Sequence, residues 1–443
     1  MKPEDARREF LKLGYPAEEL KRMADEELLA ELEVLKAIHE AGVTDEDVEE
    51  LRDRLKETSW GDDWTGFLFA DPSRLFEHGW HVLFVGLTGQ GKTTNMTSYA
   101  VALLNRGWRI FWRDDSGLEW LALAWHYPDE TLVFVPKGCR LEGLDFLEFA
   151  EYDPEKPMNI FRKAERSGRS LFPILFDVFC WDLEYTCRFY SRLFTMMIYH
   201  LARMPYSKKS LWAFFVDELN DLVQPHGREI TKAHAEVRGT IVFNLRKVRK
   251  HGFKLVASTH RLTQIPLDVR TNFSYHLIHK SLGYDVYEFF SKALITAPAK
   301  VFWTVLKCVI TQEPGECFFF DYKWSYDWIK PRMIIDKDTI LKRLEWRIEG
   351  TVGPEPEADR WTWERQGAEL ILRALRNALK TGHVRYRDIA KAMGLTGSWV
   401  FEVINDRILG KPELKALWDE VLELARLRVV RRQHKPPPIE ELQ

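Results

Sequence analysis

The chain has 443 residues, more than one compact core usually needs, so two or three domains are expected. Hydrophobic residues make up 45% and charged residues 30%, as in a globular protein, and a net charge of −3 excludes a uniformly basic coat for nucleic acid. Five cysteines without a CxxC pair, no membrane-length apolar run and no signal-peptide pattern lead us to expect a cytoplasmic protein that spans no membrane.

Residues 1–60 are acidic, with 18 Asp and Glu against 10 Lys and Arg. Their pattern predicts short amphipathic helices, and Thr44 and Asp47 have the spacing of a capping box at the start of the last one. We expect an acidic helical module that packs or oligomerises, and a dedicated partner site is the alternative.

Residues 61–335 alternate short apolar runs with helical periods, which predicts an α/β core with a mainly parallel sheet. The expected strands are 81–85, 108–112, 131–135, 172–178, 211–216, 254–258 and 275–279. A closing hairpin is predicted from 301–310 to 316–322, with its turn at 313–315.

The segment 86–93 reads GLTGQGKT and matches the P-loop motif GxxxxGK[ST] between an apolar run and a helical pattern. Its backbone N–H groups should cradle the phosphates of ATP, while Lys92 neutralises the β and γ phosphates and the Thr93 hydroxyl binds Mg²⁺. This motif predicts a RecA-like P-loop NTPase core. The expected nucleotide-binding residues here are Gly86, Thr88, Gly89, Gln90, Gly91, Lys92, Thr93 and Thr94.

A second motif supplies carboxylates after the apolar run 211–216. Asp217 is predicted to hold the Mg²⁺ water shell, and Glu218 to deprotonate the attacking water, which would make the chain a hydrolysing ATPase.

With these motifs, residues 67–333 resemble the FtsK-HerA superfamily of ring-forming DNA-pumping ATPases, which includes viral genome-packaging motors. Asp114 begins a segment, 114–120, that is similar to the family's acidic turn near the nucleotide. The helical segment 181–204 stands in the family's order, and 246–261 (RKVRKHGFKLVASTHR) followed by 263–272 is similar to its basic helix, sensor strand and following segment.

The resemblance implies that Arg249 is a trans-acting finger for the neighbouring subunit's γ-phosphate and that Thr259 and His260 lie at the nucleotide. A solvated basic helix face is the alternative for Arg249, and Arg246 or Arg261 are the next candidates for the finger. Family members usually carry Gln where this chain has His260, so sensing could fall to His260, Thr259 or Gln264.

Residues 336–360 are predicted as a linker, 361–434 as a helix-turn-helix DNA-binding domain and 435–443 as a disordered tail. A helical bundle for protein contacts is the alternative for 361–434. The residues expected to meet DNA are Arg385, Arg387, Lys391, Ser398, Trp399, Asn405 and Arg407.

These features together predict an Mg-ATP-driven translocase of double-stranded DNA that acts as a homo-oligomeric ring of six subunits. A nuclease or another DNA-processing protein is a partner that the resemblance allows. The competing hypothesis is an ATP-switched, sequence-specific DNA-binding protein for replication initiation or partition.

Overall fold

The structure is a computed structural model. It describes residues 7, 8, 10, 25–56, 69–114, 119–180, 182–203, 211–225, 231–248, 252–330, 340, 344 and 346–353. The chain divides into two compact units, and residues 31–355 form the one that contains nearly all of the described residues. The predicted helix-turn-helix domain and its seven DNA-binding residues lie outside the described residues.

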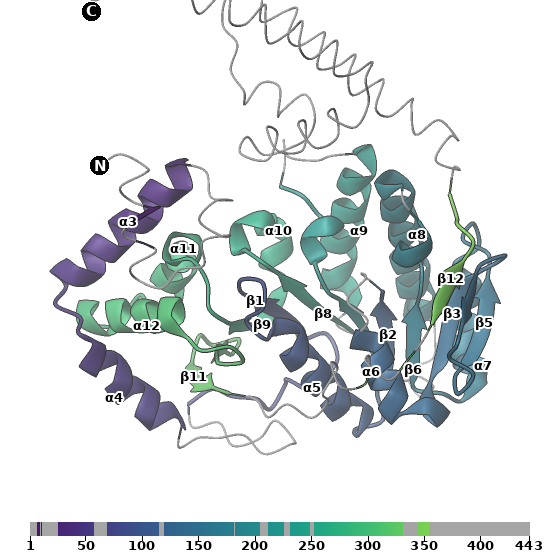
Figure 1. Ribbon diagram of the computed structural model, residues 1–443, viewed down its shortest axis with the longest axis horizontal. Coiled ribbons are helices and arrows are strands. Elements are labelled where there is room, and N and C mark those ends of the chain that lie inside the picture. The colour runs from purple at the N-terminus through teal and green to yellow at the C-terminus, as the bar shows by residue number, and fades with distance from the viewer. Residues whose placement is uncertain are drawn as a thin grey trace, which may run out of the picture. The chain divides into compact units, whose positions relative to one another are not determined.

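A ten-stranded sheet organises this unit (Figure 1). All neighbouring strands pair in parallel except β10, which is antiparallel to both β9 and β11. The strands in spatial order are β11 (Tyr326–Ile329), β10 (Cys317–Phe320), β9 (Phe273–Ile278), β1 (His81–Val85), β8 (Phe253–Thr259), β7 (Trp212–Val216), β2 (Arg109–Arg113), β6 (Leu171–Ile174), β3 (Leu132–Pro136) and β5 (Glu148–Tyr152). The prediction of an α/β fold with a mainly parallel sheet is confirmed.

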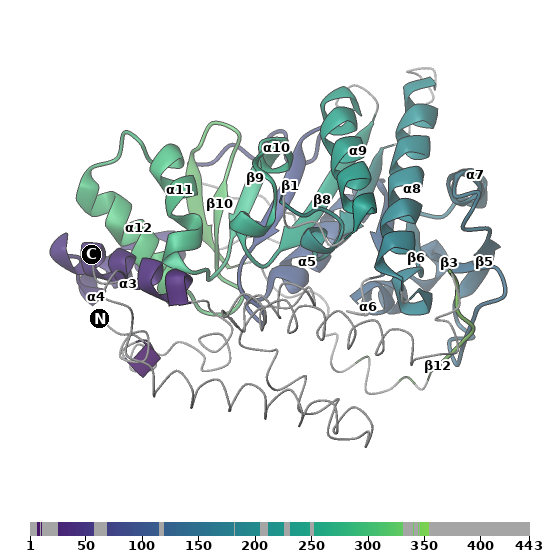
Figure 2. The same cartoon turned by 90° about the horizontal axis from the view of Figure 1, so that it is seen from above.

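Helices cover both faces of this sheet (Figure 2). The crossovers that lead from β1 towards β3 carry α5 (Lys92–Leu104) and α6 (Glu119–His126). The crossovers that return from β5 to β9 carry α7 (Met158–Ser167), α8 (Leu183–Arg203), α9 (Lys232–Val248) and α10 (Leu267–Arg270). Because parallel crossovers are right-handed, a reversal of direction along the sheet places these two sets of helices on opposite faces.

The central strands are continuous apolar runs because both of their faces are buried. Every residue of β1, β7 and β8 is buried. Aromatic rings fill much of the core: Phe111 stacks on Trp212 with ring centroids 5.1 Å apart, and Trp112 stacks on Phe215 at 4.9 Å. The heavy aromatic content therefore serves packing in this part of the sheet.

The predicted strand at 301–310 is wrong, because these residues belong to helix α12 (Ala299–Thr311). Residues 304–306 and 308–310 are all buried, so the helical period is hidden in the sequence. The Thr, Val and Ile residues of this segment also favour strands in isolation. The observed hairpin lies later in the chain and joins β10 to β11. Strand β5 was not predicted.

The N-terminal helices α3 (Asp25–Glu40) and α4 (Asp45–Lys56) precede the sheet. The predicted capping box is confirmed at the start of α4: the Asp47 N–H donates to Thr44 Oγ1 at 3.2 Å, and the Thr44 N–H donates to Asp47 Oδ2 at 2.9 Å. Helix α4 packs on α12 and β11, and Lys300 Nζ lies 2.8 Å from Asp47 Oδ1. Helix α11 (Gly283–Ala293) packs beside α12.

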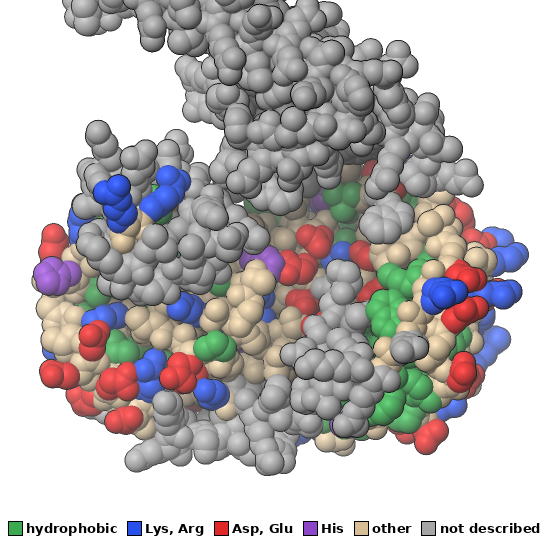
Figure 3. All heavy atoms as spheres, in the orientation of Figure 1, with side chains coloured by type: hydrophobic (Ala, Val, Ile, Leu, Met, Phe, Trp, Pro, Cys, Tyr) green, Lys and Arg blue, Asp and Glu red, His purple; other side chains and the backbone are tan. Residues whose placement is uncertain are grey.

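Short elements complete the unit. Strand β4 (Arg140–Glu142) pairs with β12 (Arg347–Glu349), which lies within the region 336–360 that the sequence predicts as a linker. The single-turn helices are η1 (Pro128–Glu130), η2 (Asp177–Phe179), η4 (Leu219–Asp221) and η5 (Leu262–Gln264). On the face seen in Figure 3, acidic and basic side chains of the described residues are interspersed, in keeping with the small net charge.

Candidate functional site: a P-loop between three parallel strands

The P-loop joins the end of β1 to the start of α5 and needs glycine at two positions. A Cβ on Gly86, whose φ is +152°, would lie 2.6 Å from the Cβ of His279. A Cβ on Gly91, the N-cap of α5 with φ +85°, would lie 2.9 Å from the Cα of Gly315. The Cβ of His279 and the backbone of Gly315 thus lie too close to the loop for any side chain at these two positions, and only glycine allows this approach.

Lys92 is the first residue of α5 and is 5% exposed. Its Nζ donates to the Leu87 carbonyl oxygen at 3.0 Å, so the ammonium is folded back across the loop it belongs to. Its Nζ also lies 3.2 Å from His260 Nδ1. The ammonium thus sits at the loop that would surround the phosphates, as the motif predicts.

Thr93 and Asp217 meet across the sheet edge, where the Thr93 hydroxyl donates to Asp217 Oδ2 at 2.8 Å. The other oxygen of Asp217 accepts hydrogen bonds from the Ser258 hydroxyl and from the Glu218 N–H. The Thr93 hydroxyl and the Asp217 carboxylate are two adjacent oxygen ligands of the kind that Mg²⁺ accepts, since Mg²⁺ takes most of its other ligands from water and phosphate oxygens. No group of three or more His, Cys, Asp or Glu within the described ranges is arranged to hold a metal ion.

Glu218 follows Asp217 and has a left-handed backbone with φ 51° and ψ 55°. Its N–H donates to Ser258 Oγ at 3.1 Å, and its side chain turns towards His260. Burial raises the pKa of the Glu218 carboxyl, but the hydrogen bond from His260 and the charge of Lys92 lower it by more, so the net pKa lies below the usual value. The carboxylate is therefore ionised at neutral pH, as a general base must be.

His260 lies between the P-loop and the carboxylate of Glu218. Its Nε2 lies 2.6 Å from Glu218 Oε1, while its Nδ1 lies 3.2 Å from Lys92 Nζ and 3.5 Å from Thr88 Oγ1. Since an ammonium only donates, Nδ1 accepts from Lys92 and the ring proton on Nε2 is donated to Glu218. The P-loop, the second carboxylate and the end of β8 are thus joined through one imidazole.

Thr259, the last residue of β8, lies beside the P-loop, where its carbonyl accepts from the Gly86 N–H at 3.2 Å. Thr259 turns its hydroxyl to Asn220 Oδ1 at 3.3 Å and to the Arg261 carbonyl at 3.1 Å. Arg261 donates to the Tyr284 hydroxyl at 3.0 Å, which directs it towards α11. Asp114 is buried directly after β2, and its N–H donates to the Ile174 carbonyl. Gln264 ends η5, and Arg249 lies outside the described residues.

Thr88, Gly89 and Gln90 lie in the turn before α5, and Thr94 lies in its first turn. The Gln90 carbonyl accepts a hydrogen bond from the Gly315 N–H at 3.0 Å. The structure therefore brings together the P-loop, Asp217, Glu218, Thr259 and His260, at the carboxyl ends of the adjacent strands β1, β8 and β7. This edge is where open α/β sheets bind ligands.

Three charged residues near this edge, Arg113, Asp177 and Asp221, were not predicted from the sequence. Arg113 ends β2, and its guanidinium pairs with Asp177 at 2.7 Å and lies 3.7 Å from Asp221. Burial, together with the nearby charges of Glu218 and Asp177, raises the pKa of Asp221 to about 6 although Arg113 lowers it. The sequence does contain a pattern that could have identified Arg113 and Asp177 as residues near the site, because each lies at or just after the end of an apolar run.

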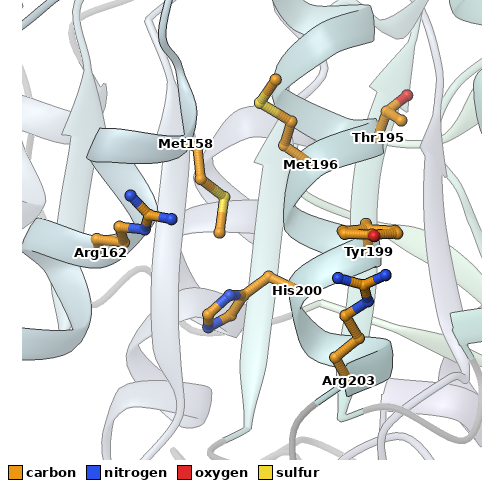
Figure 4. A pocket seen from close by; sticks show the side chains of 7 residues that line it. All are labelled: Met158, Arg162, Thr195, Met196, Tyr199, His200 and Arg203. Carbon is orange, nitrogen blue, oxygen red and sulfur yellow. The ribbon is translucent and has the colours of Figure 1, made fainter.

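A separate cavity of about 360 Å³ lies between α7 and α8 (Figure 4). It is lined by Met158, Arg162, Thr195, Met196, Tyr199, His200 and Arg203. Helix α8 starts near the nucleotide edge and runs back across the sheet, so residues in its last turns lie at the opposite end. The Arg203 guanidinium stacks on Tyr199 at 3.8 Å from the ring centroid.

None of the helices in the described part of the chain is both long enough and apolar enough to cross a membrane.

No protein-family model and no curated protein matches the sequence. Among solved structures, the chain is similar to the genome-packaging NTPase B204 from Sulfolobus turreted icosahedral virus 2, with 12% identity, coverage of 57% of this chain and 97% of that one, and a TM-score of 0.35. It is similar to the pCW3 conjugation coupling protein TcpA, with 15% identity, coverage of 59% and 62%, and a TM-score of 0.35. It is also similar to the bacterial conjugative coupling protein TrwB, with 11% identity, coverage of 59% and 86%, and a TM-score of 0.39. Likeness at this level assigns no activity.

Proposed function

We propose that this chain is an Mg-dependent ATPase of the FtsK-HerA type that moves double-stranded DNA through a homo-oligomeric ring of six subunits in the cytoplasm. One observation carries the catalytic part of the proposal. An ionised Glu218 lies directly beside Asp217, at the same strand ends as the P-loop residues Lys92 and Thr93. The proximity of these four groups supports hydrolysis as well as nucleotide binding.

In this mechanism, the backbone N–H groups of 86–93 surround the phosphates and Lys92 neutralises charge on the β and γ phosphates. Thr93 and Asp217 would hold Mg²⁺, which neutralises phosphate charge when it is bound. Glu218 orients the attacking water and takes its proton as the water oxygen bonds to the γ-phosphorus, while the bond from that phosphorus to the β–γ bridging oxygen breaks and ADP leaves. His260 donates to Glu218 and accepts from Lys92, so it orients both groups.

The DNA part of the proposal rests on sequence. It depends on the resemblance of 246–261 to the family's basic helix and sensor strand, and on the helix-turn-helix pattern in 361–434. In this proposal, Arg249 reaches the γ-phosphate bound by a neighbouring subunit. Arg385, Arg387 and Lys391 contact phosphates of the DNA, and the second helix of the motif faces a groove.

The second candidate is a regulator in which nucleotide state gates sequence-specific DNA binding. The pattern at 385–404 favours this candidate, because Gly394 stands at the tight turn between two helices whose apolar residues fit a helix-turn-helix. A regulator needs slow turnover, whereas a motor needs turnover that DNA accelerates.

ATP turnover with and without duplex DNA, combined with triplex displacement, separates these candidates. The motor predicts DNA-stimulated turnover that stops with EDTA, and ATP-dependent displacement of the third strand. Slow turnover with tight binding to one duplex sequence would favour the regulator. Electron microscopy of the same sample tests the ring directly, since lone subunits with ATP and DNA would contradict it.

A further inference from the structure

The buried side chain of Arg113 donates hydrogen bonds to the backbone of the two carboxylate residues, Asp217 and Glu218. Arg113 is 2% exposed and ends β2, which pairs with β7. One terminal nitrogen of its guanidinium donates to the Asp217 carbonyl oxygen at 3.2 Å and to the Glu218 carbonyl oxygen at 3.3 Å. A single side chain on a neighbouring strand thus holds two successive peptide groups at the end of β7.

Glu218 itself has an unfavourable backbone conformation. Among the described residues, only Glu218 and Trp324 have a positive φ without being glycine. A left-handed backbone is strained for a residue with a long side chain, so it persists only where surrounding contacts hold it. The Glu218 N–H donates to Ser258 Oγ and to Asp217 Oδ1, and its carbonyl accepts from the Asp221 N–H at 2.9 Å and from Arg113. Of these groups, Arg113 is the one that also binds the preceding carbonyl, that of Asp217.

Arg113 is itself fixed in place. Its Nε and its second terminal nitrogen donate to Asp177 at 3.2 and 2.7 Å, and Tyr190 Oη donates to the other oxygen of Asp177 at 2.6 Å. Burial lowers the pKa of Arg113, but Asp177, Tyr190 and Asp221 raise it by more, so the guanidinium stays charged. The planar fork of an arginine can serve Asp177 and the two carbonyls at once, which the ammonium of a lysine cannot.

We infer that Arg113 is a positioning residue for ATP hydrolysis, holding Glu218 in its left-handed conformation so that the carboxylate faces the attacking water. The inference rests on the proposed function, because it assumes that Glu218 is the base. The competing explanation is that Arg113 only neutralises the partly buried carboxylate of Asp177, in which case the two carbonyl contacts have no effect on turnover.

Arg113→Lys tests the inference by keeping the charge and removing the fork. Misplacement of a catalytic group by about 1 Å can cost about 10²-fold in rate. We therefore expect kcat for ATP to fall by roughly 10- to 100-fold, while KM and the Kd of a non-hydrolysable ATP analogue stay within about threefold, because the P-loop is untouched. Unchanged kcat in a folded Arg113→Lys protein would overturn the inference.

A double variant separates positioning from charge neutralisation. Arg113→Gln with Asp177→Asn removes both charges of this ion pair and leaves a neutral polar pair, so thermal stability should recover relative to Arg113→Gln alone. Turnover should stay low, because the two carbonyls still lack the guanidinium. A double variant that regains wild-type kcat would show that neutralisation of Asp177 was all that Arg113 does.

Arg238→Lys is the matched control, since the guanidinium of Arg238 also donates through two nitrogens to one carboxylate, that of Asp268, and this pair joins α9 to α10. It should leave kcat unchanged. Failure of this inference is distinguishable from failure of the proposed function: a wild-type protein that does not hydrolyse ATP contradicts the function, whereas an active wild type with an equally active Arg113→Lys contradicts only the inference.

Discussion

The Nε2 atom of His260 lies 2.6 Å from Oε1 of Glu218, and the other ring nitrogen lies 3.2 Å from Nζ of Lys92. The imidazole therefore links the proposed base to the phosphate-facing lysine. A glutamine can also accept with one atom and donate with another, which explains how histidine can stand where the resembling family usually has Gln.

Replacement of His260 should affect turnover according to hydrogen-bonding capacity. His260→Ala removes a hydrogen bond to a charged group, worth about 1.5–3 kcal/mol, so kcat should fall roughly 10- to 100-fold. His260→Gln should stay within about threefold of the wild type. Steady-state ATP turnover checks both, with the exposed His126 at the end of α6 as the control position. Equal rates for His260→Ala and wild type would show that the contact is incidental.

Glu31 should matter for stability. It is fully buried and accepts the Gly283 N–H at 2.9 Å and the Tyr284 N–H at 2.8 Å, at the start of α11. Glu31→Ala leaves both donors without this carboxylate, so the free energy of unfolding should fall by about 2–3 kcal/mol in urea titrations.

Glu33 on the same helix provides the control, because its side chain is 71% exposed and pairs only with the exposed Lys36 among the contacts seen here. Glu33→Ala should change the free energy of unfolding by less than about 0.5 kcal/mol. Equal losses for the two variants would mean that capping of α11 by Glu31 adds nothing.

Acid should destabilise the fold through His276. Burial and the nearby Arg270 lower the pKa of His276 from 6.5 to about 3. The folded pKa is below the unfolded one, so the stabilising contribution is complete above pH 6.5 and is lost as the pH falls, because the unfolded chain binds the proton first.

His276→Phe removes this titration, and the rings of Phe289 and Trp324 at 5.0 and 5.9 Å can pack against a phenyl group. Between pH 6.5 and 5, the wild type should lose about 1 kcal/mol of unfolding free energy per pH unit more than the variant. Parallel pH profiles of the two proteins would contradict the assignment.

Replacement of Arg249, the proposed finger, should impair hydrolysis in the neighbouring subunit's site and leave ATP binding in its own subunit intact. Arg249→Ala should bind ATP normally and hydrolyse it about 10³-fold more slowly. Mixing Arg249→Ala with Glu218→Gln subunits should restore some turnover, since some interfaces then combine an intact Glu218 with an intact Arg249. Near-normal DNA-stimulated turnover by Arg249→Ala alone would move the finger to Arg246 or Arg261.

Local patterns predicted much of the site. The P-loop and the Asp217–Glu218 pair are contiguous motifs after apolar strands, so sequence located them and the structure brings them together. The contacts of His260 with Lys92 and Glu218, and of Arg113 with the carbonyls of Asp217 and Glu218, join residues far apart in the chain. Only the order of strands in the sheet reveals these contacts. The segment 301–310 was mispredicted because burial on most sides hid its helical period.

The central claim is that Glu218 is the base of an ATP-hydrolysing P-loop site. The most direct test compares ATP binding and turnover in Glu218→Gln and in Lys92→Ala. Glu218→Gln should bind ATP like the wild type and lose about 10²-fold or more in turnover, because an amide cannot take the proton. Lys92→Ala should abolish hydrolysis by removing the phosphate-facing ammonium. Wild-type turnover by Glu218→Gln would contradict the claim.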